Sequence, residues 1–415
     1  MSEEGLSVII ITHNNEHIGR VVEAVLDQTS SVDEVILVND HSDEGFLDGI
    51  PDHPSLRIAT PVMEGNRSHN RNIGAKLSSC GILVFIDGDV LIQEGSLSFI
   101  RDIGRHAPLT FNVMAQSITL EQLCILNQRT DIMKDILDRR FEHLDRLEGM
   151  RDWRLDDSPY SPDMEDWCVF YSLFCSIPRD LFIQAGGFDE SIKGWGCEDV
   201  DLGFRLKRMG ANIHFIEDVR AVHIPHPRNS YVQNLNGRRN LYHMLQNYRD
   251  VDIERVIAFG TSSIVRSALS NILAICSSMD DACVIPPDCD LTLTFRSGNP
   301  VLSVCDKFEK IEWMSFGLAI PFENTHFHLA YVSESFFLLP EGFYCRVLQE
   351  LCRVSECVIT KYPNGKNRPR FDGWINDSLK HAYCYTDIIH LSNQIRDFSF
   401  QNNGEYVEVS YHSRV

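Results

Sequence analysis

Apolar side chains follow two alternating spacings over about the first 115 residues. Short β-branched runs, typical of strands that are buried on both faces, stand at Ser7–Thr12, Glu34–Asn39 and Gly81–Ile86, with a weaker run at Leu56–Ala59. Between these runs, the apolar residues of His17–Gln28 recur at helical spacing, and Asn70–Ser79 is also expected to be a helix. This alternation predicts an α/β fold with a doubly wound, mostly parallel sheet. Ligands of such sheets bind beyond the carboxyl ends of the strands.

The pattern continues to about residue 250 with one long interruption. Residues 118–155 are rich in Leu, Asp and Arg at helical spacing, which predicts a helical insertion. A strand is expected at Phe170–Ile177, a helix from about Glu198, and final strands at Asn212–Ile216 and Ala221–Val222. We therefore expect a first domain over residues 1–248 and a smaller α/β domain over residues 249–415. The second domain is expected to open with a strand at Val256–Gly260.

Composition narrows the class of protein. The chain is 43% hydrophobic and 23% charged, as is usual for globular proteins. Its 13 cysteines include no CxxC pair, which favours reduced thiols in a cytoplasmic protein. The N-terminus lacks the basic and apolar regions of a signal peptide, and no apolar run approaches the ~18 residues of a membrane span. We therefore expect a cytoplasmic protein with no integral membrane segment.

The net charge of −21 bears on possible ligands. General nucleic-acid binding requires a basic surface, so this charge argues against it. A nucleotide diphosphate would also be repelled unless a cation or a local basic group offsets the field.

Two carboxylates follow the predicted strand that ends at Ile86. Asp87 and Asp89 are separated only by Gly88, so they can share one divalent cation. Hard oxygen ligands suit Mg²⁺ or Mn²⁺, and such a cation would offset the charge of a diphosphate. The alternative is an ordinary polar turn, because Asp and Gly favour turns.

A second cluster lies between Gly186 and Asp201. Its glycines, Gly187 among them, permit close approach of backbone to a ligand, and Trp195 offers an apolar face for a sugar ring. Glu198 and Asp199 stand at the predicted start of a helix, where a carboxylate could act as a general base on an acceptor hydroxyl. The alternative is simple stabilisation of the helix N-terminus by acidic residues.

Further candidates lie at strand ends. His223, with His226 three residues later, is a candidate third metal ligand, although an isolated His is more often structural. Possible nucleotide contacts are Thr12, Asn14 and Asp40, at the ends of the first two predicted strands. Arg71, in the next predicted helix, is a further one. Neither GxGxxG nor GxxxxGK[ST] occurs in a nucleotide-binding context, which argues against dinucleotide and P-loop sites.

Together these residues resemble glycosyltransferase family 2 over about residues 6 to 245. The resemblance rests on four motifs in order: Thr12-His13-Asn14, Asp40-His41-Ser42-Asp43, Arg71-Asn72 before Asp87-Gly88-Asp89, and Gly186–Glu190 followed by Trp195–Leu202. The last of these is also similar to segments of galactosyltransferases and polypeptide N-acetylgalactosaminyltransferases. The resemblance implies a GT-A type fold and a metal-dependent enzyme that uses a UDP-sugar.

The resemblance also implies roles for individual residues. Asp40 and Arg71 would contact the uridine and Asp87 the nucleotide, while Asp89 and His223, or else His226, would hold the metal. Asp199 would be the catalytic base of an inverting displacement, and Glu198 would bind the acceptor or the donor sugar. Two positions depart from the pattern: Asn39 stands where Asp is common, and Cys197 where Gly is common.

The C-terminal region has a weaker resemblance to class I methyltransferases. It is carried by Val256–Gly260, by Ala319–Ala330 and by Val347–Val354. The loop Gly260–Ser263 lacks further glycines, which implies an inactive or repurposed form of that fold. The alternative is an unrelated α/β domain for acceptor binding or dimerisation.

The sequence thus predicts a glycosyltransferase that moves a sugar from a UDP-sugar to a peptide, glycan or small-molecule acceptor with Mn²⁺ or Mg²⁺. The helical segment 120–154 is expected to select the acceptor. The alternatives are a non-catalytic binder of the same fold and a sugar nucleotidyltransferase, which would need a Gly-rich basic loop after the first strand. The oligomeric state stays open, a homo-oligomer included.

Overall fold

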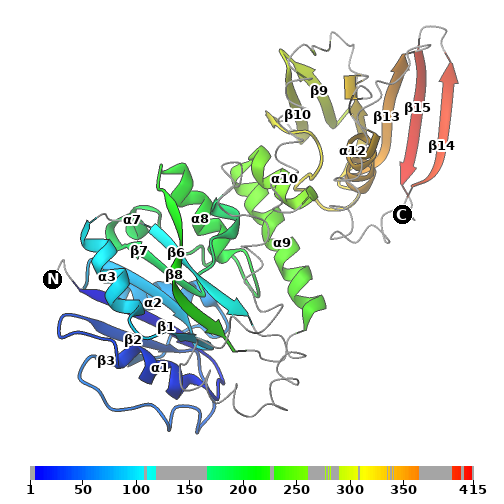
Figure 1. Ribbon diagram of the computed structural model, residues 1–415. Coiled ribbons are helices and arrows are strands. Elements are labelled where there is room, and N and C mark those ends of the chain that lie inside the picture. Colours follow the sequence, from blue (N-terminus) through cyan, green and yellow to red (C-terminus); the bar gives the residue numbers. More distant parts are fainter. Residues whose placement is uncertain are drawn as a thin grey trace, which may run out of the picture. The chain divides into compact units, whose positions relative to one another are not determined.

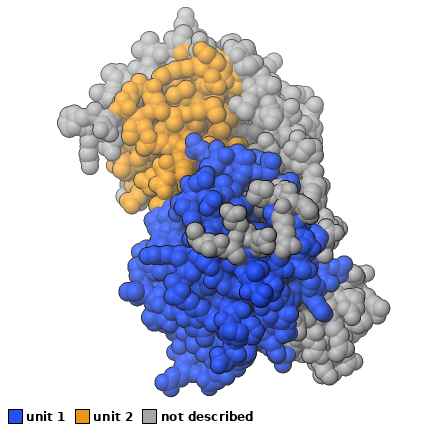
Figure 2. Space-filling model, turned by 90° about the vertical axis from the view of Figure 1, so that its left-hand side faces the viewer, with its two compact units in different colours: residues 1–161, 165–240 blue, residues 162–164, 241–415 orange. Residues whose placement is uncertain are grey.

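The computed structural model describes residues 5–106, 110–117, 166–224, 229–259, 289–306, 309–333, 341–363, 395–402 and 406–413, with isolated residues at 276, 279, 281, 335, 336 and 339. The helical insertion expected at 118–155, His226 and the loop Gly260–Ser263 lie outside these residues. The chain divides into two compact units, and the division falls between Asn240 and Leu241 (Figure 2).

Unit 1 contains one eight-stranded sheet in the order β3-β2-β1-β4-β7-β6-β8-β5 (Figure 1). Its strands are β1 (Leu6–Thr12), β2 (Glu34–Asn39), β3 (Leu56–Ala59), β4 (Ile82–Asp87), β5 (Val90–Ile92), β6 (Thr110–Ser117), β7 (Phe174–Pro178) and β8 (Ile213–His223). The strands β3, β2, β1 and β4 run parallel, and β6 is parallel to β8. The strands β7 and β5 are antiparallel to their neighbours. The predicted mostly parallel α/β sheet is confirmed.

Helices fill both faces of this sheet. On one face, α1 (Ile18–Leu26) and α3 (Ser96–His106) pack against alternate residues of β1, β2 and β4 in a single apolar core. On the other face, α2 (Arg67–Leu77) packs so closely that a Cβ at Gly74 would lie 2.3 Å from Ile9 Cγ2. The short helix α7 (Arg179–Gln184) adds Phe182, whose ring centroid lies 5.3 Å from that of Phe85. Burial on both faces explains why the central strands are continuously apolar.

The remaining helices of unit 1 follow the sheet. They are the 3₁₀ turn η2 (Asp166–Val169), α8 (Glu198–Arg208) and α9 (Ser230–Tyr248), of which the last continues past Asn240. The α8 helix packs against η2 so tightly that a Cβ at Gly203 would lie 2.8 Å from the Trp167 carbonyl oxygen.

Unit 2 holds a seven-stranded sheet in the order β11-β10-β9-β12-β13-β15-β14. Its elements are α10 (Val251–Phe259), β9 (Leu291–Arg296), β10 (Asn299–Asp306), β11 (Glu309–Met314), β12 (Phe327–Val332), α12 (Glu341–Val354), β13 (Ser355–Pro363), β14 (Ile395–Asn402) and β15 (Tyr406–Ser413). Parallel pairs join β9, β12 and β13, and the outer strands are antiparallel.

Two sequence-based boundaries were wrong. The strand expected at Val256–Gly260 is helical as far as Phe259, because Ile253, Val256 and Ile257 are buried at helical spacing in α10. The two final strands expected at 212–216 and 221–222 are one continuous strand, β8. Among the described residues, no helix is both long and apolar enough to cross a bilayer.

Candidate active site

The carboxyl ends of β1, β2 and β4 form one rim of the sheet in unit 1. Thr12 pairs with Asn39 of β2, and Ile11 pairs with Asp87 of β4, so the loops that follow these strands meet. A pocket of about 460 Å³ opens there, lined by Ile11, Thr12, His13, Asn14, Asn15, Asp40, Arg67, Asn70, Asp87, Gly88 and Asp89. Sequence-predicted Thr12, Asn14, Asp40, Asp87 and Asp89 are therefore brought together. The pocket has the size of a site for a small molecule or nucleotide.

The turn between the two carboxylates is fixed by backbone contacts. The Gly88 N–H donates to the Ile11 carbonyl at 3.0 Å, and a Cβ at Gly88 would lie 2.7 Å from that oxygen. Only glycine fits this approach, which brings the turn across the end of β1. The turn leads directly into β5, whose Val90 pairs with His223 of β8. Asp89 and His223 are thereby held side by side.

Asp89 and His223 form a pair that can bind a cation. Asp89 Oδ1 lies 3.4 Å from His223 Nε2, and the Asp89 carbonyl accepts from the Ile224 N–H at 2.8 Å. Within the described residues, no group of three His, Cys, Asp or Glu side chains converges as a complete metal site. A carboxylate and an imidazole nonetheless suit Mn²⁺ or Mg²⁺ that takes its other ligands from phosphate oxygens and water. The residues present therefore fit a cation that arrives with a diphosphate.

Arg71 lies next to the pocket and joins Asp87, which lines it, to Glu198 of α8. Its Nη2 donates to Asp87 Oδ1 at 2.7 Å and its Nη1 to Glu198 Oε1 at 3.1 Å, and only 2% of its surface is exposed. Burial alone would lower the pKa of Arg71, but Asp87 and Glu198 outweigh burial and raise it. Arg71 is not among the residues that line the pocket, in contrast to the predicted contact with a nucleotide. It acts as the counter-ion of two carboxylates that are 111 residues apart in sequence (198 − 87).

Asp199 stands in the first turn of α8 and is held by two backbone N–H groups. Its Oδ1 accepts from Val200 at 2.8 Å and its Oδ2 from Ser172 at 3.4 Å. Burial, followed by the neighbouring charge of Glu198, raises the pKa of Asp199 to about 7 although Arg71 opposes the shift. A carboxylate with a pKa near neutrality is well matched to general-base work.

The helix that carries both carboxylates begins in an unusual way. Cys197, the residue before α8, has φ 74°, in the left-handed region that favours glycine. Gly194 and Gly196 on the same loop also have positive φ. This backbone turns the chain sharply, so that Glu198 is buried while Trp195 on the preceding loop stays 36% exposed. Trp195 packs over Gly237 of α9, whose Cβ position lies 3.7 Å from Trp195 Cζ3.

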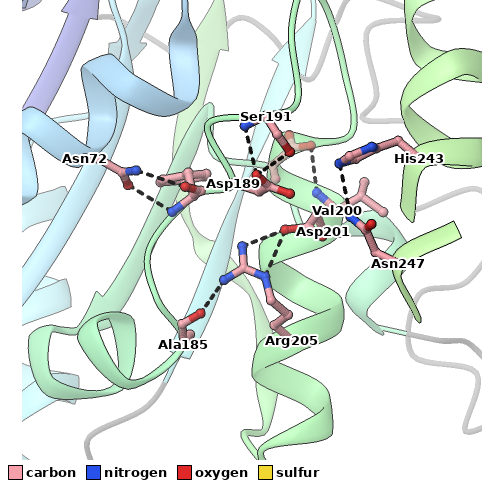
Figure 3. A network of polar contacts seen from close by, with 11 residues as sticks. Asn72, Ala185, Asp189, Ser191, Val200, Asp201, Arg205, His243 and Asn247 are labelled. Carbon is pink, nitrogen blue, oxygen red and sulfur yellow. Dashed lines mark hydrogen bonds and ion pairs between the residues drawn. The ribbon is translucent and has the colours of Figure 1, made fainter. Parts of the chain in front are cut away.

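The 185–190 segment, which precedes that loop, is hydrogen-bonded to α2. The side chain of Asn72 donates to the Phe188 carbonyl and accepts from the Phe188 N–H, both at 2.9 Å (Figure 3). Gly187 sits against the same side chain, since its Cβ position lies 2.8 Å from Asn72 Oδ1, and it does not line the pocket. The Gly186–Gly187 turn therefore serves packing in this structure.

A second link in Figure 3 holds this segment to α8. Arg205 Nε and Nη2 donate to Asp201 Oδ2 at 2.9 and 2.6 Å, and Nη1 donates to the Ala185 carbonyl. Hydrogen bonds thus connect α2 to the 185–190 segment and that segment to α8.

Two pocket residues on α2 were missed by sequence reasoning. Arg67 and Asn70 belong to the first turn of α2, which begins three residues earlier than expected from the apolar spacing. The signal was Asn66, a favoured N-cap residue whose Oδ1 accepts from the His69 N–H at 3.0 Å. Among the described residues that line the pocket, Arg67 is the one cation, against the carboxylates of Asp40, Asp87 and Asp89.

Comparison with known proteins places these residues in a family. A family model described as "Glycosyltransferase like family 2" matches residues 7–257. Validoxylamine A glucosyltransferase from Streptomyces hygroscopicus subsp. jinggangensis (strain 5008) is 28% identical over 247 residues, covering 54% of this chain and 56% of that enzyme. Rhamnosyltransferase WbbL from Escherichia coli (strain K12) is 22% identical over 268 residues, covering 60% of this chain and 94% of that enzyme.

The match thus spans little more than half the length of the first of these relatives. Among solved structures, the mannosyltransferase PcManGT from Pyrobaculum calidifontis in complex with GDP-Man and Mn²⁺ aligns with a TM-score of 0.42 and 15% identity. That alignment covers 68% of this chain and 76% of that one.

Proposed function

The chain belongs to the glycosyltransferase-like family 2, and from this we propose that it is a glycosyltransferase that moves a sugar from a UDP-sugar to an acceptor hydroxyl with the help of Mn²⁺ or Mg²⁺. The acceptor is a peptide, a glycan or a small molecule. We assign catalysis to residues 1–248 and treat residues 249–415 as a separate domain. The free cysteines among the described residues, several of them buried, support a cytoplasmic location.

The position of Arg71 supports this proposal more than any other observation. A single buried guanidinium joins Asp87, at the end of β4, to Glu198, at the start of the helix that carries Asp199. The donor pocket and the candidate base are therefore neighbours fixed by one contact. A transferase needs this arrangement, because the acceptor must approach the sugar of a bound donor within reach of a base.

The charge of the pocket supports dependence on a metal. Three carboxylates and one guanidinium line it, on a chain whose net charge is −21. A diphosphate would meet net repulsion there unless a divalent cation entered with it. Bound between Asp89 and His223, such a cation would neutralise charge on the departing nucleoside diphosphate.

The remaining roles follow from the surroundings of each side chain. Asp199 removes the proton from the acceptor hydroxyl, since its raised pKa makes it a suitable base near neutral pH. Glu198 Oε2 is buried without a hydrogen-bond partner among the described residues, which supports a contact with a sugar hydroxyl. Trp195 offers its exposed ring to the acceptor or donor sugar. A direct attack assisted by Asp199 would invert the configuration of the anomeric carbon.

A donor screen tests the proposal. The protein is mixed with Mn²⁺ and a panel of UDP-sugars and other nucleotide-sugars, and the released nucleoside diphosphate is measured. We expect slow hydrolysis of one donor that stops with EDTA. The Asp89→Ala variant should lose this turnover, whereas Asp52→Ala, which removes an exposed carboxylate outside the pocket lining, should keep it.

Two results would contradict parts of this proposal. If no donor is hydrolysed and no nucleotide binds in a metal-dependent way, the chain is a non-catalytic member of the family. Hydrolysis that survives Asp89→Ala unchanged would exclude the proposed metal site while leaving the transferase activity.

A further inference from the structure

One buried amide holds the loop 193–197, which leads into α8. Asn240 of α9 is 2% exposed. Three carbonyl oxygens of the loop face its Nδ2, at 2.8 Å for Gly196, 3.2 Å for Lys193 and 3.4 Å for Trp195. An amide nitrogen carries two hydrogens, so it pairs with the two nearer oxygens and keeps the third at the limit of hydrogen bonding. A single side chain thus joins the loop to α9.

Arg239 fixes which way this amide points. Its Nε and Nη2 donate to Asn240 Oδ1 at 3.4 and 3.3 Å, and its Nη2 also donates to the Lys193 carbonyl. A guanidinium carries only donors, so it draws the amide oxygen to its own side and leaves Nδ2 facing the loop. The two neighbouring residues of α9 therefore present donors, and no acceptor, to the loop carbonyls.

The backbone of the loop is bent around this amide. Gly194, Gly196 and Cys197 have φ values of 78°, 88° and 74°, all in the left-handed region. A residue other than glycine keeps such a φ only where its surroundings enforce it. The Cys197 thiol donates to the Gly237 carbonyl at 3.4 Å, about one helical turn before Asn240 on α9. Contacts with α9 therefore set the shape of the loop.

A shift of this loop would move two groups of the candidate site. Gly196, whose carbonyl is bonded to Asn240, lies two residues before the start of α8, and Asp199 stands in the first turn of that helix. Trp195 rests on α9 as well, because the Cβ position of Gly237 lies 3.7 Å from Trp195 Cζ3. The candidate base and the exposed ring thus depend on the same contact with α9.

We propose that Asn240 is a positioning residue for transfer, which holds the loop 193–197 so that Asp199 and Trp195 meet the acceptor in a productive geometry. Asn240 does not line the pocket, so it acts on the acceptor side and leaves nucleotide binding alone. A displacement of about 1 Å in a reacting group can cost about 10²-fold in rate. The inference rests on the proposed function, because it takes Asp199 as the base.

Three variants separate the hydrogen bonds from the shape of the side chain. Asn240→Ala removes the amide. Asn240→Asp keeps its shape and its contact with Arg239, but it places an oxygen where Nδ2 faced the loop carbonyls, which repel it. Asn247→Ala is the control, because it makes the same change about two turns later on α9, where the exposed amide is bonded to His243 (Figure 3).

The first experiment compares donor hydrolysis with nucleotide binding. Hydrolysis of a panel of UDP-sugars in Mn²⁺ is measured for the intact chain and the variants, and binding of UDP in Mn²⁺ is measured by calorimetry. Both Asn240 variants should lower kcat by about 10²-fold while their affinity for UDP stays within about threefold of the intact chain. Asn247→Ala should match the intact chain in both measurements. A variant that has simply unfolded would lose UDP binding too.

Limited proteolysis gives a measurement that does not depend on activity. Trypsin cleaves after lysine, and Lys193 is exposed although Asn240 and Arg239 hold its carbonyl. Both Asn240 variants should be cut after Lys193 about tenfold faster than the intact chain, because the loop opens locally, while cleavage at other sites stays the same. Asn247→Ala should be cut at the rate of the intact chain.

Each contrary result has a definite meaning. Unchanged hydrolysis in Asn240→Ala, or hydrolysis at the intact rate in Asn240→Asp, would overturn the inference and leave the proposed function standing. Faster cleavage at every site would overturn it too, since Asn240 would then support the fold as a whole. If the intact chain hydrolyses no donor of the panel, the inference fails, and if it also binds no UDP in Mn²⁺, the proposed function fails with it.

Discussion

Replacing Asp199 by Asn should stabilise unit 1 and inactivate the enzyme at the same time. Burial and Glu198 raise the pKa of Asp199 to about 7 in the folded chain, from an ordinary value of 3.8. The folded state therefore retains a proton that the unfolded state releases. Stability falls as the pH rises from about 4 to 7, and the loss is complete above pH 7. Asn cannot ionise, so the variant should escape this loss.

The magnitude follows from the size of the shift. About three pKa units at 1.36 kcal/mol each give roughly 4 kcal/mol above pH 7. Asn can still accept from the Val200 N–H, but it loses the long contact from the Ser172 N–H, which reduces the gain by about 1 kcal/mol. The change of this stability gain with pH tests the raised pKa of Asp199 more directly than the gain itself. Between pH 5.5 and pH 8 the gap between variant and parent should widen by about 2 kcal/mol.

Two assays separate the two effects. Urea unfolding at pH 5.5 and pH 8, followed by tryptophan fluorescence, gives the change in stability. Transfer or donor hydrolysis gives the activity, which should fall by about 10²- to 10⁴-fold with little change in nucleotide binding. In the parent, the rate should rise with pH through about 7, because the base must be ionised.

Either of two results would refute this reasoning. If the stability gap between parent and variant is the same at both pH values, the pKa of Asp199 is not raised in the folded chain. If the variant is stabilised as expected but remains active, Asp199 is not the base and a different group takes the proton from the acceptor.

Three further predictions concern packing and buried charge. Gly74→Ala should destabilise unit 1 by about 1–3 kcal/mol in urea unfolding, because its Cβ would overlap Ile9 Cγ2 at 2.3 Å; an unchanged midpoint would mean that α2 can shift freely. Burial raises the pKa of Glu254 in unit 2 to about 7, so unit 2 should lose stability between about pH 4.5 and 7; Glu254→Gln should flatten that dependence, and a persistent slope would contradict the assignment. Arg71→Met should lower stability by about 3–5 kcal/mol, since it leaves the buried Glu198 and the partly buried Asp87 unpaired, and adding Glu198→Gln should restore part of the loss in a double-mutant cycle; strictly additive effects would argue against the bridge.

The central strands of unit 1 could be predicted because their surroundings repeat along the sequence. A strand covered on both faces must be apolar throughout, and Val8, Val35 and Val84 lie in such strands. Strand β5 was missed because three residues carry no periodicity. In α10, the apolar run misled because β-branched residues suit a strand, although Ile253, Val256 and Ile257 already had helical spacing.

Some residues of the candidate site could likewise be predicted from sequence, and others could not. Asp87 and Asp89 could be placed at the rim because the end of a buried strand is visible in sequence. The partners of Arg71 could not, since nothing local indicates that Glu198 folds back onto it. Asn240 was overlooked for a related reason: the carbonyls that its amide holds belong to a distant part of the sequence, and no pattern along the chain records that contact.

The bridge at Arg71 also constrains how this sequence can diverge. A change at position 71 leaves two carboxylates without their counter-ion, whereas a change at 87 or 198 leaves Arg71 paired with the remaining carboxylate. Loss of the arginine is the less stable single step. Position 71 can lose its charge without leaving an unpaired carboxylate only when positions 87 and 198 change as well. Descendants of this chain should therefore keep Arg71 as long as either carboxylate remains, and engineers who alter donor preference at this rim should replace Arg71 only together with positions 87 and 198.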